Sequence, residues 1–248
     1  MNDLLKNKRA LITGGSRGIG AAIVKRLTQE GADVAFTYSS SAERADEIAT
    51  TARAHGVRAV AIKADSADAS DVIAAVERTV AELGGIDILI NNAGVLVVGP
   101  LDTFTLADFD RTLAVNVRAV FVATQAAVRH MKEGGRVINI GSCNAERMPF
   151  AGGGVYAMSK SALQGLVQGL ARDLGPRGIT INNVQPGPID TDMNPAGSEF
   201  ASMLIKQVMA VPRYGRAEEV AAMVAYLSGP EAGYVTGASL TIDGGFNA

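Results

Sequence analysis

Three side chains near the middle of the chain have the types and the spacing that proton transfer needs. Ser142 follows the apolar run RVINIG, and Tyr156 and Lys160 stand four residues apart in YAMSK. Residues four apart share one face of a helix, so the Lys160 ammonium can favour a Tyr156 phenolate and lower its pKa from about 10. A serine hydroxyl can stabilise charge that develops on a substrate oxygen. The three residues are therefore candidates for an acid–base site, whereas the YxxxK spacing alone also occurs by chance in many helices.

The elements that must position these residues follow a regular alternation of short β-branched runs and longer segments of helical period. We expect strands at residues 9–13, 33–37, 59–63, 87–91, 136–141, 179–185 and 239–243. We expect helices at residues 18–30, 42–55, 69–83, 105–131, 156–174 and 217–228. The pattern predicts an α/β fold: one domain over residues 1–248, with a seven-stranded, mostly parallel, doubly wound sheet and helices on both faces.

A glycine-rich turn joins the first expected strand to the first expected helix. It reads TGGSRGIG, in which Gly14, Gly18 and Gly20 allow a tight turn and a close approach of the backbone to a ligand. The helix N-terminus then offers free N–H groups to a pyrophosphate. A plain strand-to-helix connection is the alternative, and the strand–turn–helix context favours a dinucleotide site.

The spacing TGxxxGxG resembles that of the short-chain dehydrogenase/reductase family. The resemblance continues, in family order, through NNAG at 91–94, Asn116, Ser142, YxxxK at 156–160, QPGPIDTDM at 185–193 and TGASLTIDGG at 236–245. It implies a Rossmann fold and an enzyme that transfers hydride between a nicotinamide and a ketone or secondary alcohol.

The resemblance also implies a role for each catalytic residue. Tyr156 would donate the proton in reduction and accept it in oxidation. Lys160 would lower the pKa of Tyr156 and hold the nicotinamide ribose, and Ser142 would orient the carbonyl. Asn116 would hold a water that connects Lys160 to solvent. One residue more separates Ser142 from Tyr156 than in many family members, and we expect that difference to reshape the pocket wall at 147–154.

The residues after the second strand favour NADP(H) over NAD(H). The first acid there is Glu43, whereas an NAD site usually has an acid that binds the ribose 2′-hydroxyl. Arg17 lies where NADP-preferring members often carry a basic residue, although a solvated surface arginine is the alternative. Asp65 matches an adenine contact or is a helix cap. The cofactor residues that the resemblance implies are Gly14, Ser16, Arg17, Gly18, Ile19, Gly20, Tyr38, Ser39, Asp65, Ser66, Asn92, Ala93, Gly94, Tyr156, Lys160, Pro186, Gly187, Ile189 and Thr191.

The irregular segment 186–216 contains four prolines and is expected to be a substrate lid. By resemblance, Pro186 and Gly187 would flank the nicotinamide, Ile189 would pack on it, and Thr191 would meet its carboxamide or phosphate. A short helix with apolar spacing could close over the substrate. The residues expected to line the pocket, which favour an apolar or aromatic ketone but could instead be core, are Val95, Leu96, Cys143, Met148 and Phe150.

Composition excludes several other classes of function. The net charge of −2 argues against nucleic acid, and no apolar run is long enough to span a membrane. The single cysteine, the absence of Cys/His clusters and the lack of a signal-like N-terminus predict no disulfide, no metal site and a cytoplasmic location. His55 and His130 are expected at the surface. Residues 156–174 have a small-residue face and a leucine face, which, with the family habit, suggests a homotetramer.

Two other functions stay open. The first is a 3-oxoacyl-acyl-carrier-protein reductase, although the turn HMKEGGRV carries Glu133 where those enzymes carry basic residues and only Arg177 is retained. The second is a regulator on the same fold that binds a nucleotide, namely cyclic di-GMP. A pure binder has no need of four catalytic groups, so a reductase of small ketones or alcohols is the main prediction.

Overall fold

The computed structural model describes residues 3–248 and contains one parallel sheet of seven strands in the order β3-β2-β1-β4-β5-β6-β7. Chain order reverses between β1 and β4, so the sheet is doubly wound. The strands are β1 (Arg9–Ile12), β2 (Asp33–Tyr38), β3 (Ala59–Lys63), β4 (Ile88–Asn91), β5 (Arg136–Ile140), β6 (Thr180–Pro186) and β7 (Ser239–Ile242). All seven expected strands are present, with ends that differ by one residue at most.

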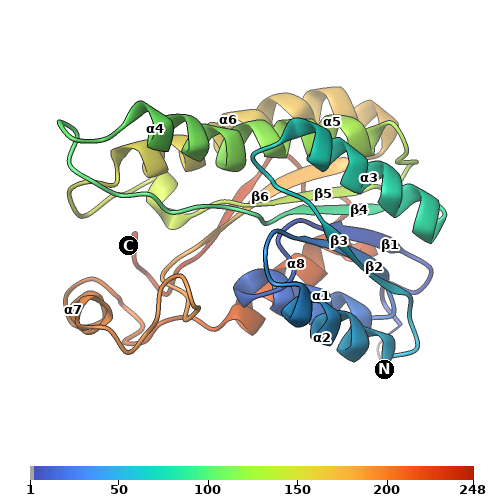
Figure 1. Cartoon of the computed structure of the whole chain (residues 1–248), viewed down its shortest axis with the longest axis horizontal. Helices are drawn as coiled ribbons and strands as arrows, with labels where there is room; N and C mark the ends of the chain where they lie inside the picture. The colour runs from blue at the N-terminus through green and yellow to red at the C-terminus, as the bar shows by residue number, and fades with distance from the viewer. Residues whose placement is uncertain (1–2) are drawn as a thin grey trace.

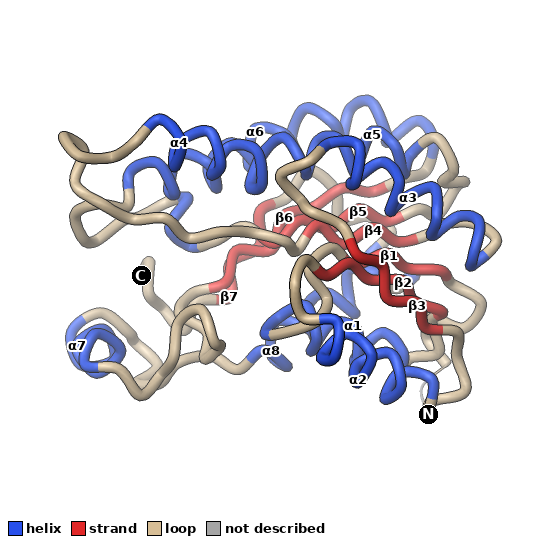
Figure 2. Tube along the Cα trace, in the orientation of Figure 1, coloured by secondary structure: helices blue, strands red, loops and turns tan. Residues whose placement is uncertain are grey.

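Helices cover both faces of this sheet (Figure 1). The helices are α1 (Gly18–Gln29), α2 (Ala42–Arg53), α3 (Ala69–Leu83), α4 (Leu106–Leu113), α5 (Ala119–Val128), α6 (Gly154–Leu174), α7 (Glu199–Gln207) and α8 (Ala217–Ser228). Short 3-10 turns are η2 (Cys143–Ala145), η3 (Gly175–Arg177) and η4 (Pro230–Ala232). In Figure 2, α1, α2 and α8 lie on one side of the strands, and α3, α5 and α6 lie on the other.

Two apolar cores form because successive strand residues point to opposite faces of the sheet. Ala10 and Ile12 of β1 pack with α1, α2 and α8, whereas Leu11 between them packs with α3, α5 and α6. The same alternation recurs on β4, where Ile88 and Ile90 join the first core and Leu89 joins the second. Burial on both faces explains why these strands are apolar nearly throughout.

The single helix expected over residues 105–131 is interrupted. The chain forms α4, then a π-helical turn, η1 (Ala114–Arg118), and then α5. Apolar residues continue through the π turn, so the sequence pattern gives no sign of it. The turn contains Asn116, and single π turns inside helices are frequent at functional sites.

The lid is tied to the body at its base and through its helix. Backbone hydrogen bonds join the two ends, from Asp190 N to Gly215 O at 2.9 Å and from Gly215 N to Pro188 O at 2.9 Å. The short lid helix is α7, whose Ala201 and Leu204 pack with Cys143, Tyr214 and Phe246 in a third apolar cluster. The lid is therefore an ordered layer beside the carboxyl ends of β5 and β6.

Within residues 3–248, every helix is too short or too polar to cross a lipid bilayer.

Candidate functional site

The predicted site residues gather at one edge of the sheet because all seven strands are parallel. The glycine turn follows β1, Asn92–Gly94 follow β4, Ser142 follows β5 after Gly141, and Gly187 follows β6. The carboxyl ends of these strands meet where ligands of open α/β sheets bind. The fold therefore brings the two predicted constellations, the glycine turn and the acid–base residues, to the same edge.

The glycine turn has close neighbours that exclude larger side chains. Gly14 has φ +68° and Gly18 has φ +53°, a region that favours glycine. A Cβ on Gly20 would collide with the Gly14 carbonyl, and one on Gly15 would lie 2.5 Å from Phe36 Cβ. The turn thus lies flat on the end of β2 and opens the N-terminus of α1, where Arg17 is the N-cap residue. This is the backbone geometry of a phosphate cradle.

The NNAG segment supports that cradle from the side of β4. Asn92 Nδ2 donates to the carbonyls of Thr13 and Gly14, both at 2.9 Å. Thr13 Oγ1 in turn accepts from the backbone N–H groups of Asn92 and Ala93, both at 3.0 Å. The Asn92 side chain therefore fixes the cradle, and Thr13 is a supporting residue that the sequence analysis missed.

Lys160 is buried between α6 and β5 and is 5% exposed. Its ammonium donates to the carbonyl of Ile140 at 2.9 Å, at the last residue of β5. It also borders Gly94, whose Cβ would stand 3.4 Å from Lys160 Nζ and 3.4 Å from Asn116 Oδ1. Burial lowers the pKa of Lys160 to about 8. Lys160, Gly94 and Asn116 thus form one compact group at the edge of the sheet.

Asn116 is held in the π turn by three hydrogen bonds and is 1% exposed. Its Oδ1 accepts from Val95 N at 2.9 Å, and its Nδ2 donates to Val95 O and to Ser159 Oγ, both at 3.0 Å. Ser159 donates at 2.7 Å to the carbonyl of Tyr156. These bonds join η1 to the segment after β4 and to the first turns of α6. The sequence analysis missed Ser159, although it immediately precedes Lys160.

Ser142 is the N-cap residue of η2, and its Oγ accepts from Asn144 N at 3.1 Å. It is 7% exposed. Its carbonyl accepts from Gln185 Nε2 at 3.1 Å. Asn183 of β6 packs beneath Gly141, where a Cβ would approach its Oδ1 to 2.6 Å. Gln185 and Asn183, two buried polar residues of β6, therefore hold the segment Gly141–Ser142 in place at the carboxyl end of β5.

A family model described as enoyl-(acyl carrier protein) reductase matches residues 14–247. The chain belongs to the short-chain dehydrogenase/reductase family. A short-chain dehydrogenase/reductase structure from Serratia marcescens is 62% identical, with a TM-score of 0.97, over 99% of this chain and 100% of that one. A Burkholderia cenocepacia short chain dehydrogenase in complex with NADP is 58% identical, with the same TM-score and coverage. A cyclic-di-GMP-binding biofilm dispersal mediator protein of Escherichia coli is 52% identical over 97% of this chain and 98% of its own length.

The pKa of Tyr156 shifts in the direction opposite to the sequence-based expectation. Tyr156 is half-buried, and Lys160 Nζ lies 5.9 Å from its ring centre. Burial raises the pKa of Tyr156 in the protein alone, and the hydrogen bond of its side chain with Ser142 only partly opposes that rise. The expected lowering of the Tyr156 pKa by Lys160 is therefore not present in the chain by itself. Tyr156 is a neutral phenol, which is the form that donates a proton.

The residues expected around the adenosine half lie at the ends of β2 and β3. Tyr38 ends β2 and is half-buried, while Ser39 and Arg17 are exposed. Glu43 lies in the first turn of α2. Asp65 is not the cap of α3, because Asp68 accepts from Ser70 N and Asp71 N in that role. Asp65 instead accepts a hydrogen bond from Ala67 N at 2.9 Å. The alternative that Asp65 caps a helix is therefore wrong. Ser66 is the half-buried neighbour of Asp65 in the same turn.

The cofactor residues expected in the lid segment 186–216 differ in their positions and in their accessibility to a ligand. Thr191 Cγ2 lies 3.3 Å from the Cβ position of Gly18, so Thr191 faces the glycine turn. Ile189 is 6% exposed and packs in the core on the α8 side, so little of its side chain is available to a nicotinamide. Pro186 ends β6, and a Cβ on Gly187 would approach Asp243 Cα to 2.6 Å, so glycine is required for this close passage.

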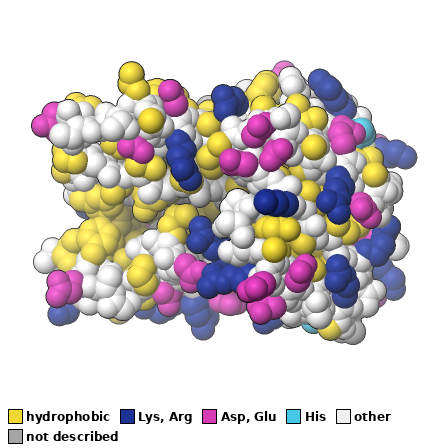
Figure 3. All heavy atoms as spheres, viewed as in Figure 1, with side chains coloured by type: hydrophobic (Ala, Val, Ile, Leu, Met, Phe, Trp, Pro, Cys, Tyr) yellow, Lys and Arg dark blue, Asp and Glu magenta, His cyan; other side chains and the backbone are white. Residues whose placement is uncertain are grey.

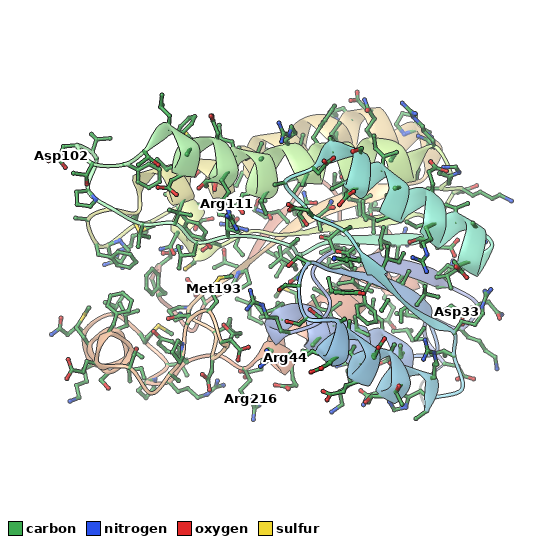
Figure 4. All side chains as sticks on the ribbon, in the orientation of Figure 1. Asp33, Arg44, Asp102, Arg111, Met193 and Arg216 are labelled. Carbon is green, nitrogen blue, oxygen red and sulfur yellow. The ribbon has the colours of Figure 1, made fainter. Side chains whose placement is uncertain are left out.

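A hollow lined largely by hydrophobic side chains opens between α7 and the α4 side of the molecule (Figure 3). The exposed hydrophobic residues of this region are Leu96 and Val98 between β4 and α4, Met193 in the lid turn and Phe200 in α7. Phe150 and Phe200 meet edge to face with ring centres 5.3 Å apart, which links the loop after η2 to α7. Cys143 does not line this hollow as expected, because it is buried in the α7 cluster. Figure 4 shows Arg111 of α4 projecting toward the same opening.

Other chemistries find little support within the described part of the chain. Burial raises the pKa of Cys143 to about 12, so its thiol is a packing group. His130 contacts Glu77 of α3 at 2.9 Å and is partly exposed. Residues 3–248 contain no group of three or more His, Cys, Asp or Glu side chains that could hold a metal ion.

Proposed function

We propose that this chain is an NADP(H)-dependent carbonyl reductase that interconverts a ketone and a secondary alcohol. The observation that carries the proposal is that Ser142, Tyr156, Lys160 and the glycine turn lie at one edge of the sheet, with the segment Asn92–Gly94 between them. The NADP complex of the 58% identical Burkholderia cenocepacia protein supports the choice of cofactor. The cofactor supplies the hydride, and the protein supplies binding, orientation and the proton.

Each site residue has a task in reduction. The glycine turn and the N-terminus of α1 would hold the pyrophosphate of NADP(H), and Arg17 would bind its 2′-phosphate. Ser142 donates a hydrogen bond to the substrate carbonyl oxygen as charge develops on it. Tyr156, a neutral phenol, transfers its proton to that oxygen. Lys160 holds the nicotinamide ribose, and Asn116 connects Lys160 to solvent through a water.

The substrate that fits the hollow is an apolar or aromatic ketone. The hydrophobic lining favours burial of such a molecule, and the charged groups lie mainly at the rim (Figure 3). A carrier-bound thioester is less well supported, because Arg177 donates to the carbonyls of Val128 and Met131 at the end of α5. That arginine stabilises a helix end, and Glu133 lies against Gly178 beside it.

A second candidate function rests on the 52% identity with the Escherichia coli biofilm dispersal mediator, whose name describes cyclic di-GMP binding. On that alternative the same edge of the sheet would bind a nucleotide as a signal. The experiment that separates the functions follows NADPH absorbance with free ketones, with a 3-oxoacyl thioester and with no substrate, beside a cyclic di-GMP binding measurement. Turnover of free ketones supports the proposal, and turnover of the thioester alone contradicts it. Nucleotide binding without any turnover favours the regulator.

We also propose that copies of the chain associate through α6 into a homotetramer. Leu163 and Val167 of this helix face the sheet, whereas Met158, Ala162 and Gly165 are exposed along the opposite side. Ser161, another small residue of α6, is half-buried and donates to the carbonyl of Ala145 within the chain. The small exposed residues Ala162 and Gly165 would let a second α6 approach closely.

A further inference from the structure

One ion pair connects the lid to the first turn of α2. Arg44 Nη1 lies 2.7 Å from Asp192 Oδ2, and the two side chains are 56% and 58% exposed. Arg44 belongs to α2, which follows β2, and Asp192 belongs to the lid, which follows β6. Figure 4 labels Arg44 on α2 and Met193, the neighbour of Asp192, on the lid. The pair spans 148 positions of sequence, so local structure does not account for it.

The position of Arg44 within α2 is unfavourable for the helix itself. Arg44 lies in the first turn, where the helix dipole favours acidic groups and disfavours cations. Glu43, its neighbour, has the favourable sign there. The helix therefore gains nothing from the charge of Arg44, and the only carboxylate that Arg44 contacts among the described residues is Asp192.

Asp192 occupies the tip of a tight turn in the lid. Thr191 and Asn194 pair across this turn, with Asn194 N donating to Thr191 O at 3.0 Å, so Asp192 and Met193 form its two tip residues. Thr191, immediately before Asp192, lies over Gly18 at the start of α1. The ion pair of Asp192 and the packing of Thr191 against Gly18 therefore involve adjacent residues of one turn.

We propose that Arg44 is a positioning residue that acts through Asp192 to hold the lid turn 191–194 over the cofactor phosphates and so slows cofactor release. The inference rests on the proposed use of a dinucleotide cofactor. A dinucleotide bound along the sheet edge would lie between β2 and β6, and the ion pair joins α2 to the lid across that edge. Opening the pair frees the tip of the turn, while the base of the lid stays tied at Pro188 and Gly215.

The size of the effect follows from the exposure of both partners. Exposed ion pairs contribute little, so loss of the pair should accelerate NADPH dissociation by roughly two- to fivefold. Salt screens such a pair. Dissociation from the wild type should therefore quicken with ionic strength, and dissociation from Asp192→Asn should depend on it less.

The test measures NADPH and NADH dissociation rates by stopped-flow fluorescence, without substrate, for the full chain and its variants. Arg44→Gln and Asp192→Asn should accelerate release of both cofactors by a similar factor. The charge-reversed double variant R44D/D192R should restore slow release, because it rebuilds the pair with the signs exchanged. Arg78→Gln, which removes an exposed ion pair with Glu82 on α3, is the matched control and should behave as the wild type.

The outcomes separate this inference from two others. If Arg44 instead bound the 2′-phosphate, Arg44→Gln would weaken the binding of NADPH but not of NADH, and Asp192→Asn would strengthen the binding of NADPH. The double variant R44D/D192R would then not restore slow release. Unchanged dissociation in both single variants would overturn the inference while leaving the cofactor assignment intact. A wild-type chain that binds neither cofactor would overturn the proposed function and this inference together.

Discussion

The ammonium of Lys160 lies 5.9 Å from the centre of the Tyr156 ring and donates to the carbonyl of Ile140 at 2.9 Å. One turn of α6 thus sets the spacing of the two functional groups, and the end of β5 fixes the lysine. The pKa of Lys160 is lowered to about 8 by burial. The pKa of Tyr156 is raised for the same reason, so the two groups titrate at a pH above neutrality.

The lowered pKa of Lys160 predicts a pH dependence of stability. Below pH 8 the lysine is charged in both states, and the folded state bears the full cost of burying that charge. Between pH 8 and 10.5 the folded protein releases the proton while the unfolded chain keeps it, so wild-type stability rises with pH. Relative to Lys160→Met, the free energy of unfolding should increase by roughly 3 kcal/mol over that range. Urea unfolding without cofactor at several pH values measures it.

The control for this prediction is Lys25→Met, which replaces an exposed lysine of α1 and should follow the wild-type curve. A constant difference between wild type and Lys160→Met from pH 7 to 10.5 would contradict the burial argument.

Tyr156→Phe should abolish reduction and leave cofactor binding intact. The substitution removes only the hydroxyl that carries the transferred proton, and general acid catalysis typically contributes on the order of a hundredfold or more. We expect turnover to fall by at least that factor, with the NADPH dissociation constant changed by less than about threefold. Tyr234→Phe, at a fully exposed tyrosine, is the matched control. Retained turnover in Tyr156→Phe would show that another group donates the proton.

Arg17→Ala should weaken the binding of NADPH more than the binding of NADH. Arg17 is exposed at the N-cap of α1, beside the end of β2, where a 2′-phosphate would lie. Loss of a charge-assisted hydrogen bond to phosphate costs about 1.5–3 kcal/mol, or roughly ten- to a hundredfold in affinity for NADPH alone. Fluorescence titration of both cofactors measures this, with Lys25→Ala as the control on the same helix. Equal weakening of the two cofactors would place Arg17 away from the 2′-phosphate.

Strand positions, and the edge of the sheet at which the candidate site residues gather, could be predicted from sequence because they depend on local patterns. Apolar runs mark strands that are buried on both faces, and the glycine and YxxxK spacings mark a turn and a helix face. The π turn at Asn116 could not be predicted, because a change in the backbone hydrogen-bonding pattern does not interrupt the run of apolar residues. The first turn of α6 begins at Gly154 and not at residue 156, since glycines give a weak helix signal.

Contacts between distant segments were the other part that sequence could not supply. The acceptor for Lys160 is a backbone carbonyl, which no residue type reveals. Asn139 of β5 accepts from Asn91 of β4 at 2.9 Å, and this buried polar link depends on strand register. The pKa of Tyr156 likewise depends on burial and on the hydrogen bond with Ser142, and neither follows from the YxxxK spacing. Each of these features is set by tertiary packing, which composition and spacing do not encode.

Gly165→Leu should disrupt the proposed tetramer without harming the single chain. Gly165 is exposed on α6, and an added Cβ meets no atom of the described residues within 4 Å. Leucine also favours helix over glycine by roughly 0.8 kcal/mol, so the isolated chain should be slightly more stable. At a close helix–helix contact, however, the new side chain would force the two α6 helices apart. Light scattering after size exclusion should show a wild-type tetramer and a smaller species for Gly165→Leu, while Ala81→Leu, on the exposed side of α3, keeps the wild-type mass. A tetramer that survives Gly165→Leu would place the interface on another face.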